Sequence, residues 1–474
     1  MRHSFKRQLS LSAITSNDLI GQHHTRDDID KLVMGFNVIL ETPKLRDAII
    51  DALTVGLDLK SDIGREGMDY WSMFVFGSAR TSLDIDYDRL QNLANNHAAL
   101  RKVIGHGDLD GHQQYGLTTL KDNIRLVTDD MLSEINTMIV KHGQKYVHPY
   151  SKKSTLTCRA DSYVAMTDVH FPTDIRLLFD SVRKVIEMVS HLCKSNNVKG
   201  YRQYKQNRNK LKRLMHKARN SKKRNETATK AAHQAYIDCA KEQLAKAKMQ
   251  LDALKASGVL FIQQTEIEGY QQYAATFISQ IERRVLKGET ISHDEKIFSI
   301  FEPHTEWICK GKAGVPVELG VKLAVVQDQH QFILHHHVME KQQDVHIAED
   351  LLVATESKYG EIDSISFDRG FWSAENEAAL KAHARKVVMP KKGYKSKERQ
   401  AIEDEKEFIK LRHKHSAVES GINALQEHGL KKILDHGIDG YKRYISFGIV
   451  GYNIHRLGAI ALSRHYRSLQ KQAA

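Results

Sequence analysis

Three acidic residues stand where a carboxylate suits catalysis better than packing. Asp161 lies inside the apparent strand TCRADSYVAM, Asp368 ends the strand SISFD, and Glu419 lies mid-helix in HSAVESGIN. A strand-borne Asp is costly to bury unpaired. Several carboxylates together suit Mg²⁺ or Mn²⁺, and two such ions about 3.5–4 Å apart can assist an in-line phosphoryl displacement. Ordinary turn and surface acids remain the alternative, because no single spacing selects a metal site.

Basic side chains are predicted near these acids. His415 precedes Glu419 by one helical turn, so the two can share a face, although a plain surface His fits equally well. Two loops combine Lys with an aromatic residue, a composition that suits a DNA backbone. The first holds Lys310 and Lys312 beside Trp307; the second holds Lys391, Lys392 and Lys395 around Tyr394. A packing Trp and solvated lysines are the plainer alternative.

Almost the whole net charge of +13 is concentrated in one segment. Residues 199–231 contain 13 Lys or Arg and a single acid, Glu226. Such a stripe is typical of a nucleic-acid partner, with a solvated helix face as the alternative. The DNA-binding candidates in this segment are Arg208, Lys212, Arg213, Lys222, Lys223 and Arg224.

Composition sets the class of protein. The 474 residues are 41% hydrophobic and 27% charged, which excludes wholesale disorder. The apolar runs are short and the N-terminus has no apolar signal core, so neither a membrane span nor a secretory signal is expected. The four Cys are far apart without a CxxC pair, which argues against a disulfide framework or a thiolate zinc site and favours a reducing cytoplasm.

Residues 1–150 are predicted to be mostly helical. Thr42 and Pro43 form an N-cap and first-turn pair, and further helices are predicted over 90–104 and 120–139. They suit a helix-turn-helix DNA reader or a plain bundle. Residues 201–257 contain no Gly or Pro, and a break at NSKKRN (220–225) predicts a basic hairpin. Its apolar series from Ile237 to Leu254 is heptad-like, which fits a dimer coiled coil or an internal packing face.

The pattern changes after residue 291. Strands are predicted at 315–326, 332–339, 362–367 and 385–389, with helices over 345–359, 374–384 and 408–426 and a closing helical pair. An upstream strand near 156–166 joins them. This order predicts a mixed α/β sheet and matches an RNase H-like core.

Several motifs resemble those of the DDE-type transposases of bacterial insertion sequences. The specific match is ADSYVAMTDVHFPTDIRLL, where His170 to Asp174 stand in the family's H-F-P-T-D element. Further resemblance lies in SIFEPHTEWICKGKAGVPVELGVK, FDRGFWSAEN and HSAVESGINALQEHGL, and also in YDRLQNLANNHAALRKVIG and GYNIHRLG. The resemblance spans nearly the whole chain apart from the basic segment.

The resemblance implies that Asp161, Asp368 and Glu419 form the catalytic and metal-binding triad, with Arg369 either holding a phosphate or positioning the end of the strand. Asp174 follows Pro172 and is expected to cap a helix. The sequence departs from the Tyr-Arg-Glu-Lys signature of many relatives, because Arg412, His415 and Gln426 occupy the positions around Glu419. Arg412 and His415 are still expected to face terminal phosphates.

The expectation is therefore an α/β transposase in four segments: an all-α DNA-binding domain (1–150), the start of an RNase H-like catalytic core (151–174), a long basic helical insertion (175–290) and the rest of the core (291–474). It would bind the terminal inverted repeats of an insertion sequence as a homodimer on double-stranded DNA, with two Mg²⁺ ions (Mn²⁺ as substitute), no membrane, and a nucleoid-associated place in a bacterial cytoplasm. A noncatalytic DNA-binding protein and an RNase H-like nuclease are the alternatives.

Overall fold

The chain forms two compact units. The computed structural model describes residues 2–5, 27–57, 67–107, 113–147, 155–221, 225–258, 262–309 and 316–473. Unit 1 is Met1–Asp168 with Ile308–Ala474, and unit 2 is Val169–Trp307. The helices of the first 150 residues thus belong to the same unit as the sheet, whereas the sequence suggested a boundary between them.

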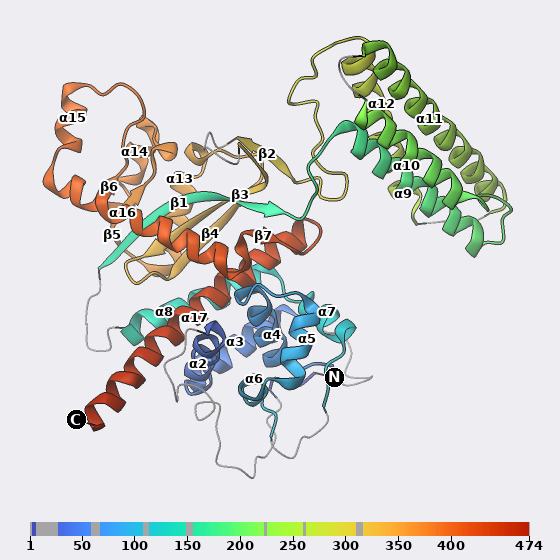
Figure 1. Cartoon of the computed structure of the whole chain (residues 1–474). Helices are drawn as coiled ribbons and strands as arrows, with labels where there is room; N and C mark the ends of the chain where they lie inside the picture. Colours follow the sequence, from blue (N-terminus) through green and yellow to red (C-terminus); the bar gives the residue numbers. More distant parts are fainter. Residues whose placement is uncertain are drawn as a thin grey trace. The chain divides into compact units, whose positions relative to one another are not determined.

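Unit 1 contains the mixed α/β sheet that the sequence predicts (Figure 1). Its strands are β1 (Leu156–Thr167), β2 (Glu306–Cys309), β3 (Val317–Asp328), β4 (Ile333–Met339), β5 (Ile362–Phe367), β6 (Ala384–Val388) and β7 (Lys432–Ile433). The main order is β2-β3-β1-β5-β6, with β4 on β3 and β7 on β1. β3 runs antiparallel to both β1 and β4, whereas β5, β6 and β7 run parallel to β1.

Helices precede, connect and follow these strands. Before the sheet come α2 (Asp28–Leu40), α3 (Pro43–Gly56), α4 (Tyr70–Ser82), α5 (Tyr87–Asn96), α6 (Ala98–Val103), α7 (Leu117–Ile124) and α8 (Asp129–Val147). Between and after the strands come η2 (Asp344–His346), α13 (Ala348–Tyr359), η3 (Arg369–Phe371), α14 (Ala374–Leu380), α15 (Lys397–Glu403), α16 (Lys406–Leu425), η4 (Gln426–Leu430) and α17 (Ile438–Ala473).

The two faces of the sheet are buried against different helices, as alternation along each strand requires. Cys158 and Ala160 of β1 pack in the large cluster that also holds α2 to α8 and α13. Tyr163 and Ala165 pack in a second cluster with α16, η4 and the first part of α17. The even and odd residues of β1 therefore point to opposite layers.

Two of the predicted N-terminal helices are each divided in the structure. The segment 90–104 breaks at His97, whose extended backbone ends α5 while its Nδ1 accepts the Leu100 N–H at 3.2 Å to begin α6. The segment 120–139 breaks before α8, where Thr128 accepts the Met131 N–H. In both cases a side chain satisfies the free N–H groups of a new helix, which periodicity alone does not reveal.

The predicted closing helical pair is instead one long helix, α17. It packs against α2, α4 and α8 and crosses them in Figure 1. Gly458 permits this contact, because a Cβ there would overlap the Lys31 carbonyl oxygen of α2. By length and composition Ile438–Ser468 could cross a membrane, but 78% of its most apolar window is buried inside the protein. That burial is typical of a core helix and is compatible with a soluble protein.

Unit 2 is a helical bundle with its own core. It contains α9 (Asp174–Ser195), α10 (Tyr204–Asn220), α11 (Glu226–Ala256), α12 (Gln264–Ile281) and the π-turn η1 (Glu282–Leu286), which lie side by side in Figure 1. The predicted break between α10 and α11 is confirmed. The heptad-like apolar series from Ile237 to Leu254 packs against neighbouring helices of the same unit. It is therefore the internal packing face that the sequence allowed, and not a dimer coiled coil. Thr173, not Asp174, caps α9 by accepting the Arg176 N–H.

Candidate active site

The first two predicted acids stand at neighbouring strand positions. β1 and β5 are parallel, and their register pairs Arg159 with Ser366 and Ala160 with Phe367. Asp161 and Asp368 follow directly after the last of these pairs. The fold therefore brings together two residues more than two hundred positions apart in the chain.

Helix α16 supplies Glu419 on the same side of the sheet. Asp161 shares the β1 face of Tyr163 and Ala165, and these pack with Val418 and Ile422 of α16. The helix also contacts β5 and β6. Glu419 and Asp368 are both exposed, while Asp161 is partly buried.

A hydrogen bond fixes the helix over the end of β5. Ser366 Oγ lies 2.9 Å from His415 Nδ1. His415 is one helical turn before Glu419, so this bond sets how α16 presents the carboxylate. His415 is accordingly a partly buried residue held between strand and helix, and not the plain surface His that the sequence also allowed.

A cavity of about 370 Å³ lies at this junction. It is lined by residues from β5, η3, the end of β6 and α16. The lining residues are Ser366, Phe367, Asp368, Arg369, Val388, Pro390, Arg412, His415, Ser416 and Glu419. Five predicted site residues therefore share one cavity: two acids, two arginines and the histidine.

The electrostatics tie Asp161 to the same group. Burial, together with the charges of Asp368, Asp344 and Glu419, raises the pKa of the Asp161 carboxyl to about 7 against the opposing hydrogen bond from the Ser162 N–H. Burial likewise lowers the pKa of His415, and the carboxylates of Asp368 and Glu419 oppose that shift. Repulsion among acids is the condition that a bound cation relieves.

The donors fit Mg²⁺ or Mn²⁺ in type. Asp161, Asp368 and Glu419 offer hard carboxylate oxygens, which these ions prefer. Asp368 and Glu419 line the cavity, whereas Asp161 is not one of its lining residues. Their closest donor atoms do not form a tight set. Across the described part of the chain, the one group of three acid, His or Cys ligands with donor atoms all within 4.8 Å is Asp28, His428 and His455.

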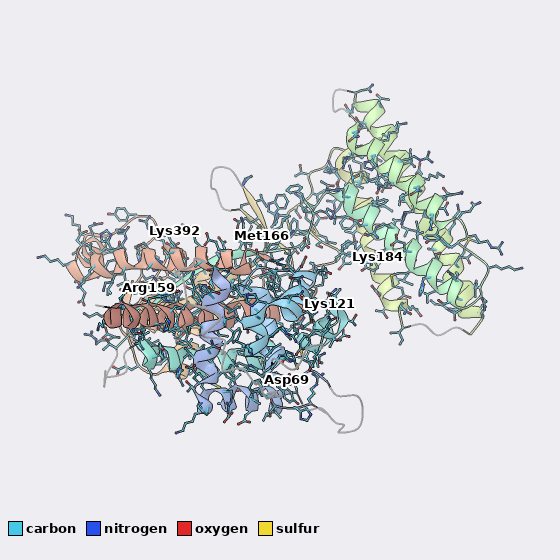
Figure 2. All side chains as sticks on the ribbon, turned by 60° about the horizontal axis from the view of Figure 1, so that its bottom comes forward. Asp69, Lys121, Arg159, Met166, Lys184 and Lys392 are labelled. Carbon is cyan, nitrogen blue, oxygen red and sulfur yellow. The ribbon has the colours of Figure 1, made fainter. Side chains whose placement is uncertain are left out.

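Two charged residues near the site are missing from the sequence prediction. Asp344 of η2 accepts from Ser162 Oγ at 2.5 Å and pairs with Lys322 Nζ at 2.9 Å. Arg159 is buried, donates to the Asp328 carbonyl and lowers the pKa of His415 (Figure 2). Arg159 could have been predicted from the sequence, because it is a charged residue inside a strand, two residues before Asp161. Asp344 could not have been predicted, because its segment lies next to β1 only in the folded protein.

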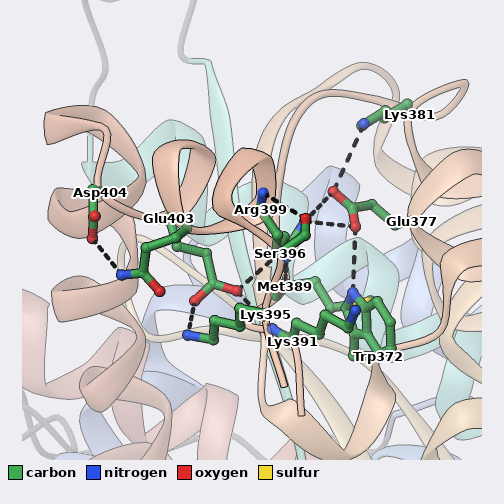
Figure 3. A network of polar contacts seen from close by, with 11 residues as sticks. Trp372, Glu377, Lys381, Met389, Lys391, Lys395, Ser396, Arg399, Glu403 and Asp404 are labelled. Atoms are coloured by element: carbon green, nitrogen blue, oxygen red, sulfur yellow. Dashed lines mark hydrogen bonds and ion pairs between the residues drawn. The ribbon is translucent and has the colours of Figure 1, made fainter. Parts of the chain in front are cut away.

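The basic loop after β6 is held by a network of ion pairs (Figure 3). Glu403 accepts from Lys395 Nζ and from the Lys391 backbone N–H, while Arg399 binds both Glu403 and Glu377. Lys391 Nζ also lies 5.0 Å from the Trp372 ring centroid. The Lys395 charge is therefore partly neutralised, whereas Lys392 is exposed to solvent (Figure 2).

The basic helix α10 belongs to unit 2. Lys212 and Arg213 are exposed, and Arg208 pairs with Glu187 at 3.2 Å. Leu211, Met215 and Ala218 are buried, so the cations occupy the opposite, outer face of α10. Lys222, Lys223, Arg224, Lys310 and Lys312 lie outside the described residues.

Comparisons with protein-family models, with curated proteins and with solved structures give no match to this chain.

Proposed function

We propose that this chain is a DDE-type DNA transposase with an RNase H-like catalytic core. It would bind the terminal inverted repeats of its own insertion sequence, cleave the element ends and join them to target DNA. The observation that carries the proposal is that Asp368, at the end of β5, and Glu419, on α16, line one cavity. Both of their charges raise the pKa of Asp161, which follows the last paired residues of β1 and β5.

The sheet topology supports the RNase H-like part of the proposal. The strands β4, β3 and β1 are consecutive antiparallel neighbours, and β5 and β6 follow on the other side of β1 in parallel. This is the order expected from three strands followed by two strand–helix crossovers. In open sheets, sites form beyond the carboxyl ends of the parallel strands, where Asp368 stands.

In the proposed reaction, Asp161, Asp368 and Glu419 would hold two Mg²⁺ ions, whose chemistry is charge stabilisation at a phosphodiester and activation of the attacking oxygen. Arg369 and Arg412 line the same cavity and would bind phosphate oxygens. His415, anchored by Ser366, would keep α16 in place.

The chemistry would consist of two displacements at phosphorus. Water attacks the phosphodiester at the element end, and the bond between phosphorus and the 3′-oxygen breaks, which leaves a 3′-OH on the element. That 3′-oxygen then attacks a target phosphodiester, its proton is lost, and the target's own 3′-oxygen leaves. No covalent protein intermediate is required.

The cations on other elements would hold the DNA backbone. Lys212 and Arg213 on α10 and Lys392 after β6 are exposed and suit nonspecific phosphate contacts. Because two ends must be joined, we expect a homodimer on DNA, associated with the nucleoid in a bacterial cytoplasm.

The test is a cleavage assay on DNA that carries the sequences flanking the chain's own gene. Wild type is compared with Glu419→Gln and with Glu405→Gln, in Mg²⁺ and in EDTA. Glu405 is a matched control, because it is exposed and begins the same helix without a side-chain cap. We expect metal-dependent nicks at the element ends by wild type and Glu405→Gln, and at least about a 100-fold loss in Glu419→Gln.

Other outcomes would point elsewhere. Unchanged nicking by Glu419→Gln would contradict the triad. Cleavage that does not require the sequences of the element ends would indicate an RNase H-like nuclease. Specific binding without cleavage in any metal would indicate a noncatalytic DNA-binding protein.

A further inference from the structure

A second group of potential metal ligands lies in unit 1, formed by three segments far apart in the sequence. Asp28 begins α2, His428 lies in η4, and His455 lies in α17. Each offers one donor atom, and these atoms lie within 4.8 Å of one another. None of the three belongs to the carboxylate site described above.

His428 is oriented as a metal-binding histidine usually is. Its Nδ1 lies 2.7 Å from the Ser82 carbonyl oxygen. A carbonyl only accepts, so Nδ1 carries the proton and Nε2 carries the lone pair. Metal-binding histidines generally donate their other ring N–H to a carbonyl or carboxylate in this way.

His455 brings a second imidazole against the first. The ring centroids of His428 and His455 are 4.4 Å apart, and His455 is 9% exposed. Its Nε2 lies 3.1 Å from Asp28 Oδ1. A metal ion would replace the proton that this pair shares.

Asp28 completes the group and opens it to solvent. Its side chain is 48% exposed, so water can reach the remaining coordination positions. Lys31 Nζ also lies 2.9 Å from Asp28 Oδ1 and would have to release that oxygen or share the carboxylate. The Tyr452 ring lies edge-on to His428 and closes another side.

We propose that Asp28, His428 and His455 bind one divalent transition-metal ion, for which Zn²⁺ is the best match. Two imidazoles and one carboxylate form a common zinc ligand set, whereas Mg²⁺ prefers oxygen ligands alone. The ion joins the start of α2 to α17 and to the turn that follows the Glu419 helix. The proposal does not depend on the transposase function.

The test uses untagged full-length protein with saturating Mg²⁺, so that the carboxylate site is occupied. Co²⁺ is titrated and its visible d–d absorption recorded, and Zn²⁺ binding is measured by calorimetry. Wild type is compared with Asp28→Asn, His428→Gln and His455→Gln. The matched controls are Asp30→Asn, in the same first turn of α2, and His465→Gln, an exposed residue of α17.

We expect one Co²⁺ or Zn²⁺ per chain in wild type and both controls, and at least about tenfold weaker binding in each ligand variant. Zn²⁺ should raise the Tm of the wild type and of the two control variants, but not the Tm of the three ligand variants. Asp28→Asn keeps an oxygen acceptor at an exposed position, so it tests the site even if a histidine variant fails to fold. Binding that survives all three substitutions, or no Co²⁺ absorption at all, would overturn the proposal.

Discussion

At the scale of single residues, Asp161 is the carboxyl most altered by its surroundings at the candidate site. Its pKa is raised to about 7 by burial and then by Asp368, Asp344 and Glu419. Metal binding requires the ionised carboxylate, so an ion must displace a proton from this group below neutral pH.

We therefore predict a proton-linked metal affinity. Below about pH 7 the apparent affinity for Mn²⁺ should fall by about tenfold per pH unit, and above it the affinity should level off. Calorimetric titration from pH 5.5 to 8.5 measures this. Glu405→Gln should reproduce the wild-type profile. A flat profile would contradict the raised pKa of Asp161.

Because its pKa is raised, the ionised Asp161 carboxylate lowers the free energy of unfolding of the metal-free protein. Between about pH 4 and pH 7 the folded protein keeps a proton that the unfolded chain has lost, so the free energy of unfolding falls as pH rises through this window. Asp161→Asn should therefore raise the free energy of unfolding of metal-free protein at pH 8, by on the order of 2–4 kcal/mol, and have little effect near pH 4. Urea titrations at both pH values measure the difference. Equal effects at pH 4 and pH 8 would contradict the electrostatic cause.

At the scale of elements, α16 packs closely against β3 at Gly421. A Cβ at this position would overlap the buried side-chain amide of Gln327. Gly421 follows Glu419 by two residues, so any shift of the helix there moves the carboxylate relative to β1 and β5.

We predict that Gly421→Ala lowers the free energy of unfolding by about 1–3 kcal/mol and reduces cleavage more than Mg²⁺-independent DNA binding. The control is Gly269→Ala in α12, where a Cβ meets nothing within 4 Å. That change should stabilise its helix by about 0.5–1 kcal/mol through lower chain entropy. Urea denaturation measures the free energy of unfolding, and the cleavage assay measures the activity. Full activity in Gly421→Ala would show that α16 tolerates displacement.

The elements that the sequence predicts best are those whose burial pattern is local. The apolar strands β1 and β5 and the helix α16 are within a few residues of their predicted bounds. Breaks such as His97 escape prediction because a helix cap depends on one side-chain contact, and α15 because it is short and charged. At the site, motif resemblance singles out Asp161, Asp368 and Glu419. Asp344 becomes visible only when the fold carries its loop to Ser162.

At the scale of the whole molecule, unit 2 has a hydrophobic core of its own, as an independent domain does. Its two apolar clusters draw only on residues 175–300, so its burial does not depend on the sheet. A segment with its own core is expected to fold without its neighbours.

We predict that residues 169–307, expressed alone, form a monomeric helical domain with a cooperative thermal transition. Circular dichroism and sedimentation measure helicity and mass. A variant with charge placed inside the apolar series of α11, Ala240→Asp, should abolish the transition because Ala240 is fully buried. A fragment without a cooperative transition would show that unit 2 depends on the rest of the chain.

The packing of α17 against α2, α4 and α8 also fixes an order of events during synthesis. Helices α2 to α8 leave the ribosome before α17 and cannot complete their core until α17 emerges. At about 5–20 residues per second, the wait from α8 to α17 is roughly 15–60 s. Unit 2 can fold during that interval, while the apolar faces of α2 to α8 await their partner. Unfinished chains would therefore depend on chaperones to cover the apolar faces of α2 to α8, and we expect a protein truncated before α17 to be degraded.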